Sequence, residues 1–134
     1  MKQKRTYITI FSHLYNGLSI LLLSIALYCL LGMFHQHRTG TLFFPFGYRP
    51  VVILSGSMEN ELPTGSIVIV KKTKEVKEND ILFFLTNNQT PVIHRYIATD
   101  ENGNFITKGD ANPLEDLEPV TIDQVFGKVI KVFD

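Results

Sequence analysis

Cysteine is almost absent from this chain of 134 residues, which contains Cys29 alone and no tryptophan. A single cysteine excludes an intramolecular disulfide and a cysteine-based metal site. An excess of charge of either sign is also lacking, because 13 basic and 13 acidic residues give a formal net charge of zero. Nothing in the overall charge therefore favours a nucleic-acid partner. We expect one small domain that is held together by packing.

Charged residues are missing from a long N-terminal stretch between Thr6 and Phe34, whose second half reads LSILLLSIALYCLLGMF. A helix that crosses the hydrocarbon core of a bilayer needs about 20 apolar residues. The stretch therefore predicts a transmembrane helix, which we assign to residues 14–34. Residues 1–13 precede this span, and residues 35–134 form the rest of the chain.

The orientation of the span follows from its flanks. Lys2, Lys4 and Arg5 precede the apolar run, and positive charge before a first span favours a cytoplasmic N-terminus. Residues 1–13 are then cytoplasmic, and residues 35–134 are extracytoplasmic. A cleaved signal peptide is the alternative, but the run is longer than an ordinary signal core and no small-x-small cleavage site follows it.

The residues after Pro50 form short runs of β-branched and aromatic residues that are separated by turn-forming residues. Such runs predict strands, and no helical period of useful length lies between them. We therefore predict a mainly β fold, with an N-terminal transmembrane helix followed by a small β domain. The predicted strands are Val51–Leu54, Ile67–Val70, Ile81–Leu85, Val92–Ala98, Asn104–Lys108 and Val125–Phe133.

Two other segments have ambiguous patterns. Residues 40–50 read GTLFFPFGYRP, and their large apolar side chains suit either the water–lipid interface or a first strand in the core. Residues 71–80 mix lysine with acidic residues, which is typical of a solvated connection.

Three segments carry residue types that are suited to hydrolysis. Ser57 stands on a glycine-containing turn after an apolar strand, where its hydroxyl can act as a nucleophile. His94 lies alone within an apolar strand, and imidazole is well suited to accept a serine proton at neutral pH. Residues 107–116 supply acids that can orient such an imidazole. Each feature also has a structural explanation by itself, as a common turn, a core histidine or an ordinary polar loop.

Taken in order, the segments VVILSGSMEN, PTGSIVIV, PVIHRYIA and FITKGDANPLED resemble the signal peptidase I family. The likeness is to its endoplasmic-reticulum type, which also occurs in archaea and some Gram-positive bacteria, and it covers roughly residues 14 to 132. The resemblance implies a serine endopeptidase that removes signal peptides from exported preproteins and needs no metal or organic cofactor.

The resemblance also implies a role for each matching residue. Ser57 matches the nucleophile, and His94 occupies the position of the general base. Asp116 matches the acid of a Ser–His–Asp triad, while Asp110 matches an acid that is important to the structure of the site. The Ser55 hydroxyl and the Ser57 backbone N–H match the oxyanion hole.

The chain departs from the family pattern in places. The family usually has a proline two residues after the methionine, whereas here Asn60 stands there and the first proline is Pro63. The C-terminal VFGKVIKVFD is too short for the second span of some relatives. Arg95 follows His94 in a strand and should point to the opposite face, so we expect a structural role for it.

These observations predict a single-pass cell-membrane signal peptidase whose partners are secretory preproteins and the lipid bilayer. One alternative is a related Ser–Lys self-cleaving regulator, in which a lysine such as Lys108 serves as the base. The other is an anchored β domain without activity that binds a secretion partner. The separation between the Ser57 hydroxyl and the His94 ring distinguishes a catalytic site from such a binding domain.

Overall fold

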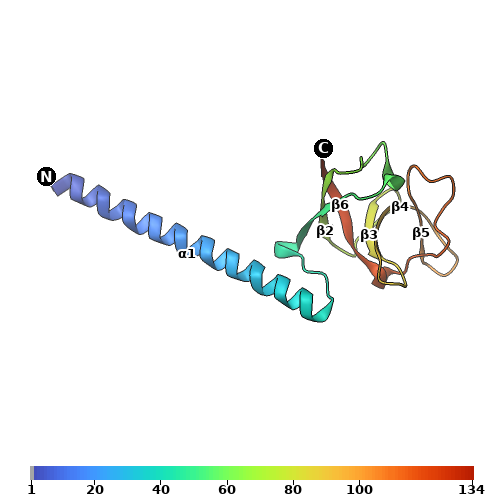
Figure 1. Cartoon of the computed structure of the whole chain (residues 1–134), viewed down its shortest axis with the longest axis horizontal. Helices are drawn as coiled ribbons and strands as arrows, with labels where there is room; N and C mark the ends of the chain where they lie inside the picture. The colour runs from blue at the N-terminus through green and yellow to red at the C-terminus, as the bar shows by residue number, and fades with distance from the viewer. Residues whose placement is uncertain (1) are drawn as a thin grey trace. The chain divides into compact units, whose positions relative to one another are not determined.

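The computed structural model describes residues 2–134, with side chains from Phe11 onward. The chain divides into two compact units, which meet between Pro45 and Phe46. The first unit contains one long helix, and the second contains all the strands (Figure 1).

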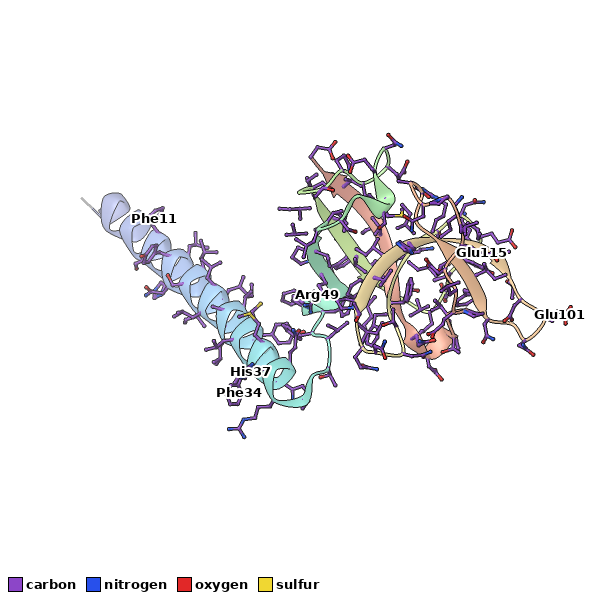
Figure 2. All side chains as sticks on the ribbon, turned by 45° about the vertical axis from the view of Figure 1, so that its right-hand side comes forward. Phe11, Phe34, His37, Arg49, Glu101 and Glu115 are labelled. Carbon is purple, nitrogen blue, oxygen red and sulfur yellow. The ribbon has the colours of Figure 1, made fainter. Side chains whose placement is uncertain are left out.

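The helix α1 spans Lys2–Thr39, so it extends beyond the predicted span at both ends. Its segment Phe11–Thr39 has a mean hydropathy of 2.3 and is long and apolar enough to cross a membrane. Its side chains, such as the labelled Phe11 and Phe34, point outward into the surroundings (Figure 2). An isolated apolar helix of this kind suits a lipid environment, because nothing in its own unit buries most of its surface.

The chain turns back on the helix directly after α1. Gly40 adopts a φ of +70° and its N–H donates to the Gln36 carbonyl at 2.8 Å, which is a common way for a helix to end. The Phe43 N–H then donates to the Gln36 side chain at 2.9 Å. The Phe43 ring lies against Gly32, where a Cβ atom would come within 2.1 Å of it. The aromatic segment therefore begins by packing on the helix and is not an open linker.

The second unit is a six-stranded antiparallel sheet in the order β1-β2-β6-β3-β4-β5. This confirms the predicted mainly β fold with one N-terminal helix. The 40–50 segment ends in β1, so its last residues form a first strand as expected, but this strand lies at the edge of the sheet and not in the core. The strands are β1 Tyr48–Val52, β2 Ile67–Lys72, β3 Ile81–Leu85, β4 Pro91–Thr99, β5 Phe105–Lys108 and β6 Val125–Phe133.

The core of this unit lies around β3, whose first four residues are all buried. Leu82 and Phe84 pack with Tyr96 of β4 and Val125 of β6, together with Val120 from the segment before β6. A strand that is covered on both faces needs apolar residues at successive positions, and ILFFL supplies them. The packing fixes β4, the strand that carries His94.

The charged run at residues 71–80 is mostly exposed, as expected for a solvated connection, but it also has partners in the sheet. Lys71 and Lys72 belong to β2, and Asp80 forms an ion pair with Lys128 of β6 at 2.8 Å. The Lys74 ammonium donates to the Ile122 carbonyl at 2.5 Å. The run is therefore tied to the sheet at several points, and alternating charge in the sequence did not reveal these partners.

Candidate active site

Ser57 stands on a short 3₁₀ helix, Gly56–Met58, that follows β1. The Met58 side chain beside it is 1% exposed, and Leu62 at the end of the same loop is fully buried. The Leu62 N–H donates to the Met58 carbonyl at 2.8 Å. These two buried apolar side chains hold the turn in place. Ser57 itself remains half-buried.

His94 of β4 connects Ser57 to Asp116. Its Nε2 lies 3.1 Å from the Ser57 Oγ, and its Nδ1 lies 2.7 Å from the Asp116 Oδ2. An ionised carboxylate can only accept hydrogen bonds, so Nδ1 carries the proton and Nε2 accepts from the serine hydroxyl. The His94 side chain is 12% exposed and that of Asp116 is 24% exposed. Three residues far apart in the sequence are therefore joined in one hydrogen-bonded chain.

Thr107 of β5 is a fourth member of this group, and the sequence reasoning missed it. Its hydroxyl donates to the Asp116 Oδ2 at 2.6 Å, and its carbonyl accepts from the Asp116 N–H at 2.8 Å. The residue is fully buried. The available signal was a threonine that follows two apolar residues just before the acidic loop, and such a threonine by itself is typical of an ordinary strand.

Asp110 lies in the same loop but belongs to a different contact. Its carboxylate accepts from the Arg95 Nε at 2.8 Å and from the Arg95 Nη2 at 2.5 Å. This hydrogen bonding raises the pKa of Arg95 above its ordinary value. In the described part of the chain the Asp110 carboxylate pairs with the guanidinium, because Arg95 points to the face of β4 opposite His94.

The loop that contains Asp110 also contacts the turn that carries Ser57. The Ala111 N–H donates to the Ser57 carbonyl at 2.9 Å, and the Asp110 N–H donates to the Met58 sulfur at 3.4 Å. A Cβ atom at Gly109 would come within 2.6 Å of the Ser57 carbonyl oxygen. Glycine therefore allows the two loops to approach each other closely at this point.

Ser55 lies next to Ser57. Its Oγ is 3.2 Å from the Ser57 Oγ. Ser57 is in the first turn of the 3₁₀ helix, where backbone N–H groups have no partner within the helix. Among the described residues, a hydroxyl and an unpaired backbone N–H therefore lie near the Ser57 Oγ, and both are types of donor that stabilise oxyanions in hydrolases.

Comparison with known proteins identifies the family of the domain that carries these residues. Residues 48–130 match the family model described as Peptidase S24-like. The chain belongs to that family. Signal peptidase I W of Bacillus subtilis is 41% identical over 86 residues, which are 60% of this chain and 45% of that protein. The signal peptidase complex catalytic subunit SEC11 of Scheffersomyces stipitis is 35% identical over 72 residues, 50% of this chain and 43% of the relative.

A human relative has the same kind of name. Signal peptidase complex catalytic subunit SEC11C of Homo sapiens is 34% identical over 73 residues, 49% of this chain and 38% of the relative. The matched region therefore spans less than half the length of each of these relatives. Their names confirm the predicted resemblance to signal peptidase I.

Two cavities meet at His94 in this S24-like domain. One of about 410 Å³ lies between the end of β1 and the start of β4, and Ser55 and Ser57 line it together with mostly apolar residues. The other, of about 450 Å³, lies along the β3–β4 turn and the loop that carries Asp116. Val92 and His94 line both cavities. Ser57 lines the first cavity and Asp116 lines the second.

Two strand edges border the first cavity. The Ile53 N–H donates to the Ser66 carbonyl at 2.9 Å on the β2 side, so the preceding residue, Val52, directs its backbone groups to the outer edge of β1. On β4, the Tyr96 N–H donates to the backbone carbonyl of Asp80, on the β3 side. Because backbone groups alternate between the two sides of a strand, those of Ile93 point away from β3. Because β5 pairs with β4 only from Arg95 onward, the edge at Ile93 has no strand beside it among the described residues.

Proposed function

We propose that this chain is a membrane-anchored signal peptidase I, a serine endopeptidase that removes N-terminal signal peptides from exported preproteins. One observation carries the proposal: Asp116, His94 and Ser57 form a continuous hydrogen-bonded chain in a domain whose named relatives are signal peptidases. Ser57 is the nucleophile, His94 is the general base, and Asp116 orients the imidazole.

The reaction follows from this geometry. The Ser57 Oγ attacks the scissile carbonyl while its proton moves to His94 Nε2, 3.1 Å away. Asp116 keeps the other ring proton on Nδ1 and stabilises the imidazolium. His94 then gives its proton to the departing amine, which leaves an acyl-serine. Water attacks the acyl group with His94 again as the base, and the serine is released.

The oxyanion of the tetrahedral intermediate is stabilised by the Ser55 hydroxyl and the Ser57 N–H. The Ser55 Oγ is 3.2 Å from the Ser57 Oγ. A small rotation of the Ser55 side chain therefore brings its hydroxyl to the oxyanion, which is bonded to the same carbon as the Ser57 Oγ. One such donor is worth on the order of 3 kcal/mol of barrier in other enzymes.

The substrate binds in extended form between β1 and β4. The outward backbone groups of Val52 and Ile93 face a peptide there and hydrogen-bond to it as neighbouring strands do. The mostly apolar residues around the cavity favour small uncharged side chains before the cleaved bond. A carboxylate or ammonium group in that position would lose its hydration without gaining a partner.

The anchor brings enzyme and substrate into one bilayer, which raises their effective concentration. The proposed orientation is a cytoplasmic N-terminus and an extracytoplasmic β domain, and it rests on Lys2, Lys4 and Arg5, whose side chains lie outside those that the structure describes. A reporter fused after Asp134 that is active only outside the cytoplasm tests this. Activity of that fusion in the cytoplasm contradicts the orientation.

Cleavage of a preprotein by the full chain in detergent micelles tests the activity. We expect a new N-terminus at the signal-peptide junction, identified by mass spectrometry, and no product from Ser57→Ala or His94→Ala. Binding of the preprotein without cleavage by the wild-type chain would instead favour a non-enzymatic anchored domain. A Ser–Lys mechanism predicts that Lys108→Met is inactive. The contacts favour His94 as the base, because in the described residues the Ser57 Oγ is hydrogen-bonded to His94 and Ser55.

A further inference from the structure

Two polar side chains are buried among the described residues, those of Ser66 and Thr107. The Ser66 hydroxyl donates to the Pro63 carbonyl at 2.7 Å, as a hydroxyl in a turn commonly does. The Thr107 hydroxyl donates instead to the Asp116 carboxylate. A buried hydroxyl aimed at the outermost member of the Ser–His–Asp chain requires an explanation that strand packing does not supply.

We propose that Thr107 is a positioning residue, whose hydroxyl holds the Asp116 carboxylate in the orientation that receives the His94 Nδ1–H. The inference rests on the proposed function and extends it to a residue outside the triad. The Asp116 Oδ2 accepts from Thr107 at 2.6 Å and from His94 at 2.7 Å. The two donors come from different strands, His94 from β4 and Thr107 from β5.

The loop around Asp116 leaves its side chain otherwise unsupported. Glu115 and Leu117 on either side are exposed, and Leu117 is 99% exposed. No further hydrogen bond to the Asp116 carboxylate is present within residues 11–134, apart from those of Thr107 and His94. The Asp116 N–H, which donates to the Thr107 carbonyl, anchors the backbone but leaves the side-chain torsions free. Thr107 is therefore the contact that selects the rotamer.

The consequence of losing this contact falls on His94. A carboxylate that is released from Thr107 can turn toward water, since Asp116 is already 24% exposed. The neutral imidazole then populates the tautomer with its proton on Nε2. That tautomer cannot accept the Ser57 proton, so catalysis weakens without any change in substrate contacts.

Thr107→Val and Thr107→Ser separate the hydroxyl from the packing of the side chain. Valine keeps the branched shape and removes the donor, while serine keeps the donor and removes the methyl group. Ser66→Ala is the matched control, because it deletes the other buried hydroxyl away from His94. The full chain in detergent is used throughout, with native Ser57 and ¹⁵N-labelled histidine.

We expect Thr107→Val to lower kcat roughly tenfold to a hundredfold, as the loss of one hydrogen bond to a charged group implies, with KM nearly unchanged. The imidazole ¹⁵N shifts of His94 should move from the Nδ1–H tautomer toward a mixture. Thr107→Ser should restore both the rate and the single tautomer, and Ser66→Ala should leave both unchanged. If Thr107 had only a structural role, its substitution would not change the tautomer of His94, and it would not lower kcat while KM stayed the same.

A Thr107→Val protein with the wild-type kcat and a single tautomer overturns the proposal, and so does equal loss in the valine and serine variants. If valine does not fold, Thr107→Ala is measured in its place. If Thr107→Val and Thr107→Ala both fail to fold while Thr107→Ser folds, the hydroxyl serves stability, and the proposal is overturned. The tautomer measurement needs no substrate, so it decides the role of Thr107 even if the chain cleaves no preprotein.

Discussion

Asp110 and Asp116 stand six residues apart in one loop, yet their carboxylates contact different partners. Asp116 accepts from His94, and Asp110 accepts from Arg95. We predict that Asp116→Asn retains the fold and loses catalysis, whereas Asp110→Asn loses stability together with activity. The two substitutions are chemically identical, so their difference reports only on the two environments.

The magnitudes follow from the contacts. An asparagine at 116 can donate to His94 Nδ1 and stabilise the wrong tautomer, and in a triad such a change lowers kcat by about 10⁴-fold. An asparagine at 110 leaves the Arg95 guanidinium with a weaker acceptor. Breaking a fully buried pair costs about 3–5 kcal/mol. The Arg95 and Asp110 side chains are 24% and 23% exposed, so after discounting for solvent we expect about 1–3 kcal/mol.

That loss corresponds to a fall in Tm of roughly 5–15 °C for a domain of this size. Activity falls as well, because Asp110 is followed by Ala111, whose N–H holds the Ser57 carbonyl at 2.9 Å. Catalysis is measured as preprotein cleavage. Unfolding is followed by near-ultraviolet circular dichroism of the tyrosines, since the chain has no tryptophan and α1 dominates the far-ultraviolet signal.

Ser57→Ala is the reference for a folded but inactive protein. The reasoning is refuted if Asp110→Asn keeps the wild-type Tm and abolishes cleavage while Asp116→Asn remains fully active. In that case Asp110 is the acid that orients the imidazole.

Three more predictions address two positions of the site and one in the turn between β4 and β5. His94→Lys should cleave at least 10²-fold more slowly than wild type, because the Asp116 carboxylate stabilises an ammonium that must be neutral to act as a base; wild-type turnover contradicts this. Gly109→Ala should lower kcat about 10²-fold, because its Cβ would lie 2.6 Å from the Ser57 carbonyl oxygen and displace the nucleophile; an unchanged rate shows that the loops can move apart. The hydrogen bond from the Asn104 N–H lowers the pKa of Asp100. The stability that this turn contributes is therefore present above the ordinary aspartate pKa and is lost as the pH falls through the lowered value. In urea unfolding at a series of pH values, Asp100→Asn should lack this part of the acid-dependent loss in the free energy of unfolding.

The strands were predictable because each is a short apolar run between strong turn signals. Ile81–Leu85 and Val125–Phe133 match β3 and β6 at both ends. The largest error is at β1, which spans Tyr48–Val52 rather than Val51–Leu54. Burial by itself did not mark this strand, because an edge strand alternates between exposed and half-buried residues, and the apolar Leu54 beyond its end is 86% exposed.

The contacts of the site were less predictable than its residues. The family resemblance indicated Ser57, His94 and both aspartates and assigned Asp116 to the triad, but the residues by themselves did not show which acid faces which base. That choice depends on the alternation of β4, which sends His94 and Arg95 to opposite faces. Thr107 was missed for a related reason, because a buried threonine becomes informative only when its hydroxyl has a known partner.

The departure of the nucleophile loop from the family pattern has a conformational basis. Asn60 adopts a φ of +80°, a value open to asparagine but closed to proline, whose ring holds φ near −65°. The turn at Asn60 returns the chain so that the Leu62 N–H reaches the Met58 carbonyl, and Leu62 becomes fully buried. A proline would stiffen this loop through its ring, whereas here two buried apolar side chains hold it. The position of Ser57 therefore depends on the packing of Met58 and Leu62, which couples the nucleophile to the core of the β domain.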